Sequence, residues 1–112
     1  MNIHRYTTAG GKDLIYDYVL KLTAKEQTDG FSVLEKMEEG KFSELNIKPW
    51  RGKISEVYFY KNNRMFYVIA EGENLYVLHA CRKQKNKTET TDSDKVIKRA
   101  KQLGEALSKK FI

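Results

Sequence analysis

The fold of this chain is decided by residues 54–82, which read ISEVYFYKNNRMFYVIAEGENLYVLHACR. Valine, isoleucine, tyrosine and phenylalanine, the residues that β-strands favour, are concentrated in three segments of this stretch. These segments are residues 54–61, 64–71 and 75–82. The short connections between them contain asparagine and glycine, which tolerate the positive φ of tight turns. We therefore expect three consecutive strands that form an antiparallel meander.

Helical periodicity flanks the meander on both sides. Residues 2–6 predict a short strand, and apolar residues from Lys12 onward recur at the spacing of one helix face. Thr23 and Glu26 have the spacing of a capping box, which predicts a second helix that ends at Gly40. After the meander, Asp92 or Ser93 is expected to cap a last helix. The apolar stripe of that helix consists of Val96, Ile97, Ala100, Leu103 and Leu107.

The order of these elements predicts an α+β fold. A short N-terminal strand and an α-hairpin pack on the antiparallel β-meander, and a C-terminal helix follows. Residues 48–52, which include the single proline, are expected to be a loop between the second helix and the sheet. A length of 112 residues corresponds to one domain, so we predict a single domain over residues 1–112.

Composition excludes several classes of protein. One cysteine cannot form an internal disulfide or a cysteine-based zinc site, the two histidines are too isolated in sequence to suggest one, and no nucleotide-binding or metalloprotease motif is present. We therefore expect no metal and no cofactor. The sequence has no apolar run of the ~18 residues that a membrane span needs and no signal-peptide pattern, so a cytoplasmic location without membrane contact is the default expectation.

Positive charge is concentrated in the last third of the chain. The formal net charge is +6, and residues 79–112 alone carry 10 basic and 4 acidic side chains. A localised basic segment favours a polyanionic partner, which is a nucleic acid, an anionic membrane or an acidic protein. A solvated lysine face on the last helix explains the same charge without any partner.

Alternation along the expected strands separates two faces of the sheet. One face is apolar, contains Val57, Phe59, Phe66 and Val68, and is assigned to the N-terminal helices. The other face is expected to be free and to carry Glu56, Tyr58, Tyr60, Tyr67, His79 and Lys83. Tyrosine rings beside cations suit single-stranded RNA, and these side chains are also candidate acids and bases for phosphodiester cleavage. The alternative is that strands simply favour tyrosine.

Three segments in this order resemble the RelE/ParE superfamily of bacterial toxins, and most closely its HigB-like, phage-related branch. They are SEVYF at 55–59, RMFYVI at 64–69, and VLHACRK at 77–83 with Lys87-Thr88 after it. The resemblance implies a RelE-like fold and a metal-independent endoribonuclease that cuts mRNA on the ribosome. It also implies an antitoxin partner, expected to be a helix-turn-helix DNA-binding protein.

The resemblance assigns catalytic roles to Glu56, Tyr58, Tyr67 and Lys83. Lys83 is expected to neutralise charge on the phosphate, Glu56 or Tyr58 to take the 2′-hydroxyl proton, and Tyr67 to stack on a base or hold the phosphate. The residues expected to bind RNA are Arg51, Lys53, Arg64, His79, Arg82, Lys85 and Lys87.

This sequence departs from the branch at two of these positions. Tyr58 and Tyr67 stand where the branch usually has arginines, and a phenol supplies neither the charge nor the bidentate geometry of a guanidinium. This departure favours a second hypothesis, in which the chain is a non-catalytic or gyrase-directed binding module of the same fold.

Overall fold

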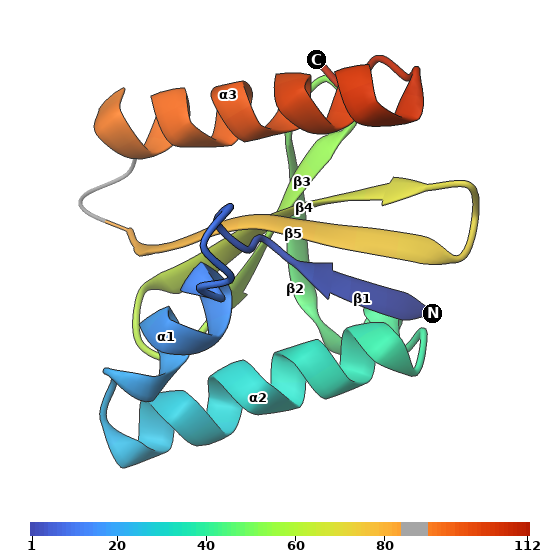
Figure 1. Ribbon diagram of the computed structural model, residues 1–112. Coiled ribbons are helices and arrows are strands. Elements are labelled where there is room, and N and C mark those ends of the chain that lie inside the picture. Colours follow the sequence, from blue (N-terminus) through green and yellow to red (C-terminus); the bar gives the residue numbers. More distant parts are fainter. Residues whose placement is uncertain (84–89) are drawn as a thin grey trace.

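A five-stranded mixed sheet forms the centre of the computed structural model, which describes residues 1–83 and 90–112 (Figure 1). The strands are β1 (Asn2–Arg5), β2 (Asn46–Arg51), β3 (Ile54–Phe59), β4 (Asn63–Ala70) and β5 (Asn74–Arg82). Their order in the sheet is β1-β5-β4-β3-β2, with β1 parallel to β5 and the other pairs antiparallel. The predicted α+β class and the meander are confirmed.

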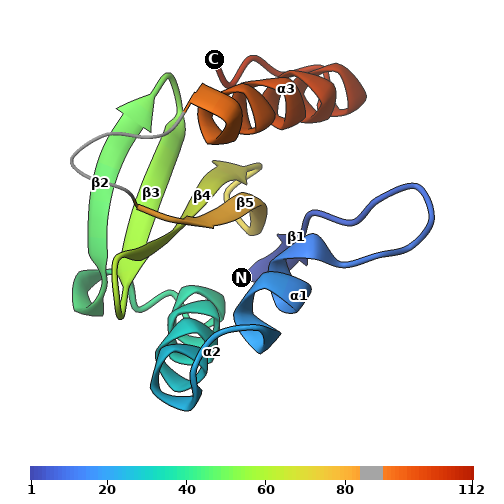
Figure 2. The ribbon, with the colours of Figure 1, turned by 90° about the vertical axis from the view of Figure 1, so that its left-hand side faces the viewer.

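Helices cover both faces of this sheet. The helices α1 (Leu14–Leu20) and α2 (Ala24–Glu38) lie on one side, and α3 (Thr90–Leu107) lies on the other (Figures 1 and 2). Thr23 and Glu26 form the predicted capping box at the start of α2. Gly30 in the middle of α2 is explained by packing, because a Cβ there would lie 3.0 Å from the Phe59 ring.

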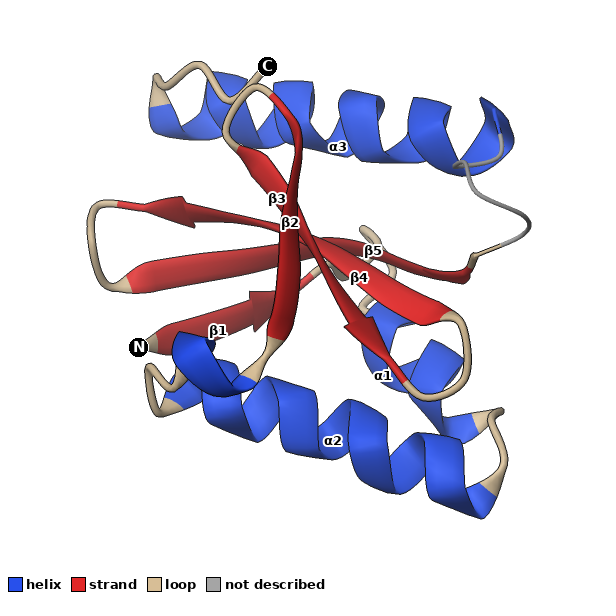
Figure 3. Cartoon of the chain, turned by 180° about the vertical axis from the view of Figure 1, so that it is seen from behind, coloured by secondary structure: helices blue, strands red, loops and turns tan. Residues whose placement is uncertain are grey.

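The segment predicted as a loop at residues 48–52 belongs largely to β2, which pairs with β3 at the edge of the sheet (Figure 3). The prediction was wrong because Pro49 argues against a central strand. An edge strand tolerates proline, since one side of its backbone faces no partner. The pairing also shifts register between Pro49 and Arg51.

The expected division of the two faces needs correction. Val57, Phe59 and Met65 pack against α1 and α2, as an apolar face should. Phe66, Val68 and Leu78 instead pack with Val96 and Ala100 of α3. The physical reason is register: Phe66 pairs with Glu56, and residues paired across antiparallel strands share a face. The face expected to be free is therefore largely covered by α3.

The last helix begins earlier than predicted, at Thr90 rather than after Asp92 or Ser93. Asp92 lies within the first turn and contacts the sheet instead of capping the helix. Among the helices of the described part of the chain, none combines the length and the apolar content needed to cross a membrane.

Candidate functional site

A chain of polar side chains runs from the sheet interior to the surface at the end of β3. Arg64 Nη1 donates to Glu56 Oε2 at 2.9 Å, and the Tyr58 hydroxyl donates to Glu56 Oε1. Arg64 is 2% exposed and Glu56 is 6% exposed, whereas Tyr58 is half-buried and reaches the surface. Both oxygens of the Glu56 carboxylate are thus engaged, and the tyrosine hydroxyl is held in a fixed direction.

Two lysines flank the ring of Tyr58. Lys83 Nζ lies 3.3 Å from the Tyr58 hydroxyl oxygen and 4.8 Å from the ring centroid. Lys48 Nζ, from β2, lies 5.4 Å from the same centroid. These three residues line a shallow cleft together with Asn46, Phe59 and Asn62. The cleft therefore presents a phenol between two ammonium groups, which suits an anionic group such as a phosphate.

Burial and the neighbouring carboxylate both act on Tyr58. Burial raises the pKa of the Tyr58 phenol above its usual value, and the hydrogen bond to Glu56 raises it further. The phenol is therefore neutral at physiological pH. Because its hydrogen already points at a carboxylate, its oxygen acts as an acceptor: one lone pair accepts from Lys83 Nζ and the other remains available toward the cleft.

Tyr67 does not join this cluster. It is buried on the opposite face of the sheet, in the core formed with α1 and α2, and its ring lies 6.4 Å from that of Phe42. The expected placement beside Tyr58 is wrong. Tyr58 pairs with Arg64, so these two residues share a face of the sheet. Tyr67 is an odd number of residues after Arg64 on the same strand, and its side chain therefore points to the opposite face.

Two arginines expected at an RNA surface also lie elsewhere. Arg64 is buried against Glu56, as described above. Arg82 projects toward α2, where its guanidinium nitrogens donate to both carboxylate oxygens of Glu26 at 3.1 and 3.2 Å. Neither arginine lines the cleft beside Tyr58.

The remaining cations expected to bind RNA are spread over the molecule. Arg51 and Lys53 are exposed at the turn between β2 and β3, at the opposite end of β3 from Tyr58. Arg51 stacks on Trp50, with its guanidinium carbon 4.9 Å from the ring centroid. Lys85 and Lys87 lie outside the described residues. Among the described residues, Lys83 is thus the one cation predicted from the sequence that lines the cleft beside Tyr58.

Sequence reasoning missed Lys48, because it lies in the segment predicted as a loop. The available signal for a strand was alternation, in which Ile47 and Pro49 alternate with Asn46, Lys48 and Trp50. The proline outweighed this signal in the prediction. Pairing with β3 places Lys48 directly opposite Glu56 and so on the face that carries Tyr58.

His79 lies on the same face as Tyr58 but inside the protein, between β5 and α3. It is 7% exposed, its Nε2 lies 2.7 Å from Asp92 Oδ1, and Arg99 Nη1 donates to its Nδ1 at 3.0 Å. Burial lowers the pKa of His79, although the hydrogen bond to Asp92 opposes this shift. The imidazole is therefore neutral at physiological pH, and it does not face the cleft beside Tyr58.

Comparison with protein families gives a match over residues 17–101, from within α1 to within α3. The family is described as phage-derived protein Gp49-like (DUF891). The chain belongs to this family. The Gp49-like family is toxin-like and related to the toxins of the RelE and HigB type, and membership implies an antitoxin partner. No curated protein matches the chain significantly.

Proposed function

We propose that this Gp49-like chain is the toxin of a type II toxin–antitoxin pair, from the HigB-like branch, and that it is a metal-independent endoribonuclease that cuts ribosome-bound mRNA. The observation that supports this proposal is the placement of the Tyr58 hydroxyl. It lies between a buried carboxylate, Glu56, and the ammonium group of Lys83. Proton transfer and charge neutralisation are the two tasks of metal-independent phosphodiester cleavage.

In this proposal Tyr58 and Glu56 act together as the base. The Tyr58 oxygen accepts the proton of the RNA 2′-hydroxyl while the Tyr58 proton passes to Glu56. The 2′-oxygen attacks the phosphorus, and the 5′-oxygen leaves and takes a proton from water. The products are a 2′,3′-cyclic phosphate and a 5′-hydroxyl. Lys83 and Lys48 neutralise the charge that develops on the phosphate oxygens.

Arg64 has a different role from the one expected of it. It stabilises the ionised Glu56 inside the protein and so positions Tyr58, rather than contacting RNA. Arg51 and Lys53 are proposed to contact the RNA or ribosome backbone at the far end of β3. The antitoxin, which we propose to be a helix-turn-helix protein, would cover the basic cleft.

Induction of the chain without its antitoxin tests the roles of these residues. Removal of a group that stabilises transition-state charge costs about 100-fold or more in rate. Lys83→Ala and Tyr58→Phe should therefore relieve growth arrest and abolish new mRNA 5′ ends. Lys98→Ala, which removes an exposed lysine of α3, is the matched control and should remain toxic at equal protein level. Full toxicity of Lys83→Ala would contradict the role of Lys83.

One observation favours a second candidate function. None of the residues that line the cleft beside Tyr58 is an arginine, so the strongest phosphate-binding side chain is missing from this part of the described structure. A non-catalytic or gyrase-directed binding module would not need one. Induction of such a module would produce DNA breaks, or arrest without any breaks, and no new mRNA ends.

A further inference from the structure

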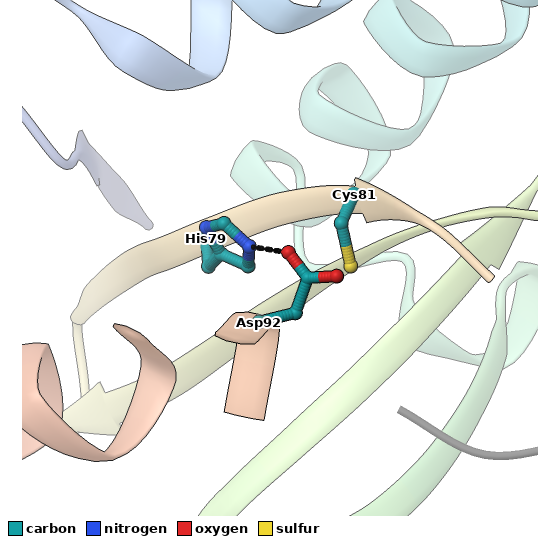
Figure 4. A group of neighbouring side chains, drawn as sticks. All are labelled: His79, Cys81 and Asp92. Atoms are coloured by element: carbon teal, nitrogen blue, oxygen red, sulfur yellow. Dashed lines mark hydrogen bonds and ion pairs between the residues drawn. The ribbon is translucent and has the colours of Figure 1, made fainter. Parts of the chain in front are cut away.

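Three side chains with different ligand atoms meet between β5 and α3 (Figure 4). They are His79 and Cys81, two residues apart on β5, and Asp92 in the first turn of α3. Their ligand atoms all lie within 4.8 Å of one another. Cys81 is 6% exposed, whereas the Asp92 side chain is 23% exposed and provides a route from solvent.

The chemistry of this donor set is that of a zinc site. Imidazole nitrogen, thiolate sulfur and carboxylate oxygen are the three ligand types that bind Zn²⁺ in proteins, and sites that retain a water need only three protein ligands. A single cysteine prevents an all-cysteine site but not a mixed one. Sequence patterns do not reveal this group, because Asp92 is distant along the chain from the two strand residues and is brought to them only when α3 packs on β5.

We propose that His79, Cys81 and Asp92 bind a zinc ion that fastens α3 to β5. This inference goes beyond the proposed nuclease and does not depend on it. The zinc ion lies between His79 Nε2, Cys81 Sγ and an Asp92 carboxylate oxygen, and a water molecule completes a tetrahedron. Metal–ligand distances of about 2.0–2.3 Å place ligand atoms roughly 3.3–3.8 Å apart in a tetrahedral site. The 2.7 Å contact between His79 and Asp92 therefore opens by less than about 1 Å.

Zinc binding moves one proton within the site and releases another. The neutral imidazole keeps one proton, which moves from Nε2 to Nδ1, so His79 releases none. Asp92 binds as the carboxylate. Cys81 gives its thiol proton to solvent, so zinc binding releases one proton per ion.

Arg99 competes with the metal for His79. Its Nη1 donates to His79 Nδ1 at 3.0 Å and to the Leu78 carbonyl at 3.0 Å. When zinc binds Nε2, Nδ1 carries a proton and can no longer accept a hydrogen bond from Arg99. Of its two hydrogen bonds, Arg99 then retains only the one to the Leu78 carbonyl. The guanidinium also lies 4.1 Å from the Tyr6 ring centroid, so it stays near the site after that hydrogen bond is lost. Arg99 therefore weakens zinc binding without being a ligand.

Titration of the full-length protein with Co²⁺ tests the ligands directly. Cobalt bound to a thiolate gives a charge-transfer band in the near ultraviolet, and this band should appear with one equivalent and disappear when zinc is added. Cys81→Ser should abolish the band. His4→Gln, which removes the other histidine of the chain, should keep it. A band that persists in Cys81→Ser, or no band in the wild type, would overturn the proposal.

A second pair of variants keeps all three ligands and so does not depend on the folding of a ligand mutant. Arg99→Gln removes one charged hydrogen bond to His79 and should tighten zinc binding by about tenfold in a buffered-zinc competition assay. Lys98→Gln removes the same charge at an exposed neighbouring position and should change binding much less. Equal effects of the two variants would contradict His79 as a ligand.

Discussion

Two glutamate–arginine pairs lie on opposite faces of the sheet, and each has a tyrosine beside it. On the α3 side, Glu56 pairs with Arg64 and also accepts from Tyr58. On the α2 side, Glu26 pairs with Arg82. Tyr18 lies near this second pair and donates its hydroxyl to Asn63 Oδ1 at 2.5 Å.

The two pairs differ mainly in the exposure of the arginine. The Arg64 side chain is 3% exposed, whereas that of Arg82 is 45% exposed. A buried ion pair is intolerant of losing one partner, because the remaining charge has neither water nor a counter-ion. We infer that the interior pair, Glu56 and Arg64, fixes the direction of Tyr58. The outer pair, Glu26 and Arg82, connects the end of β5 to α2.

The largest effect is expected from breaking the interior pair. Arg64→Met keeps the apolar volume but leaves the Glu56 carboxylate buried without a counter-ion, which should lower the free energy of unfolding by about 3–5 kcal/mol. Urea denaturation followed by circular dichroism measures this loss. The double variant Arg64→Met/Glu56→Gln should recover part of it, because a neutral amide is less costly to bury. A loss in the single variant no larger than that in Arg82→Met would remove the distinction between the pairs.

A smaller effect is expected from the outer pair, and it should depend on pH. The hydrogen bond from Arg82 lowers the pKa of Glu26 in the folded protein. Stabilisation from this pair is therefore present above the unfolded pKa of about 4.3 and is lost as the pH falls through the folded pKa. The unfolding free energies of the wild type and Arg82→Met should differ at pH 7 and converge below about pH 4. A difference that persists in acid would mean that packing, or the hydrogen bond from Arg82 Nη1 to the Lys61 carbonyl, is responsible rather than the pair with Glu26.

Tyr18 should affect stability at the alkaline end. Burial raises its pKa to about 12 in the folded protein, against about 10 in an unfolded chain. Because the phenolate forms more readily in the unfolded chain, the contribution of Tyr18 to the free energy of unfolding is fully present below the unfolded pKa. It is lost as the pH rises through the folded pKa. The wild type should lose stability between pH 10 and 12 more steeply than Tyr18→Phe does. Parallel pH profiles for the two proteins would contradict this expectation.

The smallest expected effect is spectroscopic and concerns Tyr58. Burial makes the largest contribution to its raised pKa, and the hydrogen bond to Glu56 makes the next largest. Glu56→Gln removes the negative charge and should move the pKa of Tyr58 back toward its usual value. Phenolate absorbance during an alkaline titration, with Tyr58→Phe subtracted to assign the signal, measures the shift. Glu26→Gln is the matched control and should leave the Tyr58 titration unchanged.

Part of the candidate site was predictable from the sequence. Glu56 and Tyr58 are two residues apart on one strand, so period-two alternation is sufficient to place them together. Lys83 comes directly after the end of β5, and the same period-two alternation places it on the face that carries Tyr58. Tyr67 was misplaced because alternation relates residues within a strand, whereas the relation between strands depends on register. Register also decided that Arg64 points at Glu56, and the sequence contained no signal of that pairing.

Apart from the edge strand β2, the amino-acid sequence by itself determined the type and order of the helices and strands. It did so because strand composition, turn residues and the Thr23–Glu26 capping box act over a few neighbouring residues. Only the tertiary structure decided which side chains from different elements meet. The pairing of β2 with β3 brings Lys48 opposite Glu56, and the docking of α3 brings Asp92 to His79 and Cys81. These contacts join distant parts of the chain, and burial of both sheet faces, rather than any local preference, selects them.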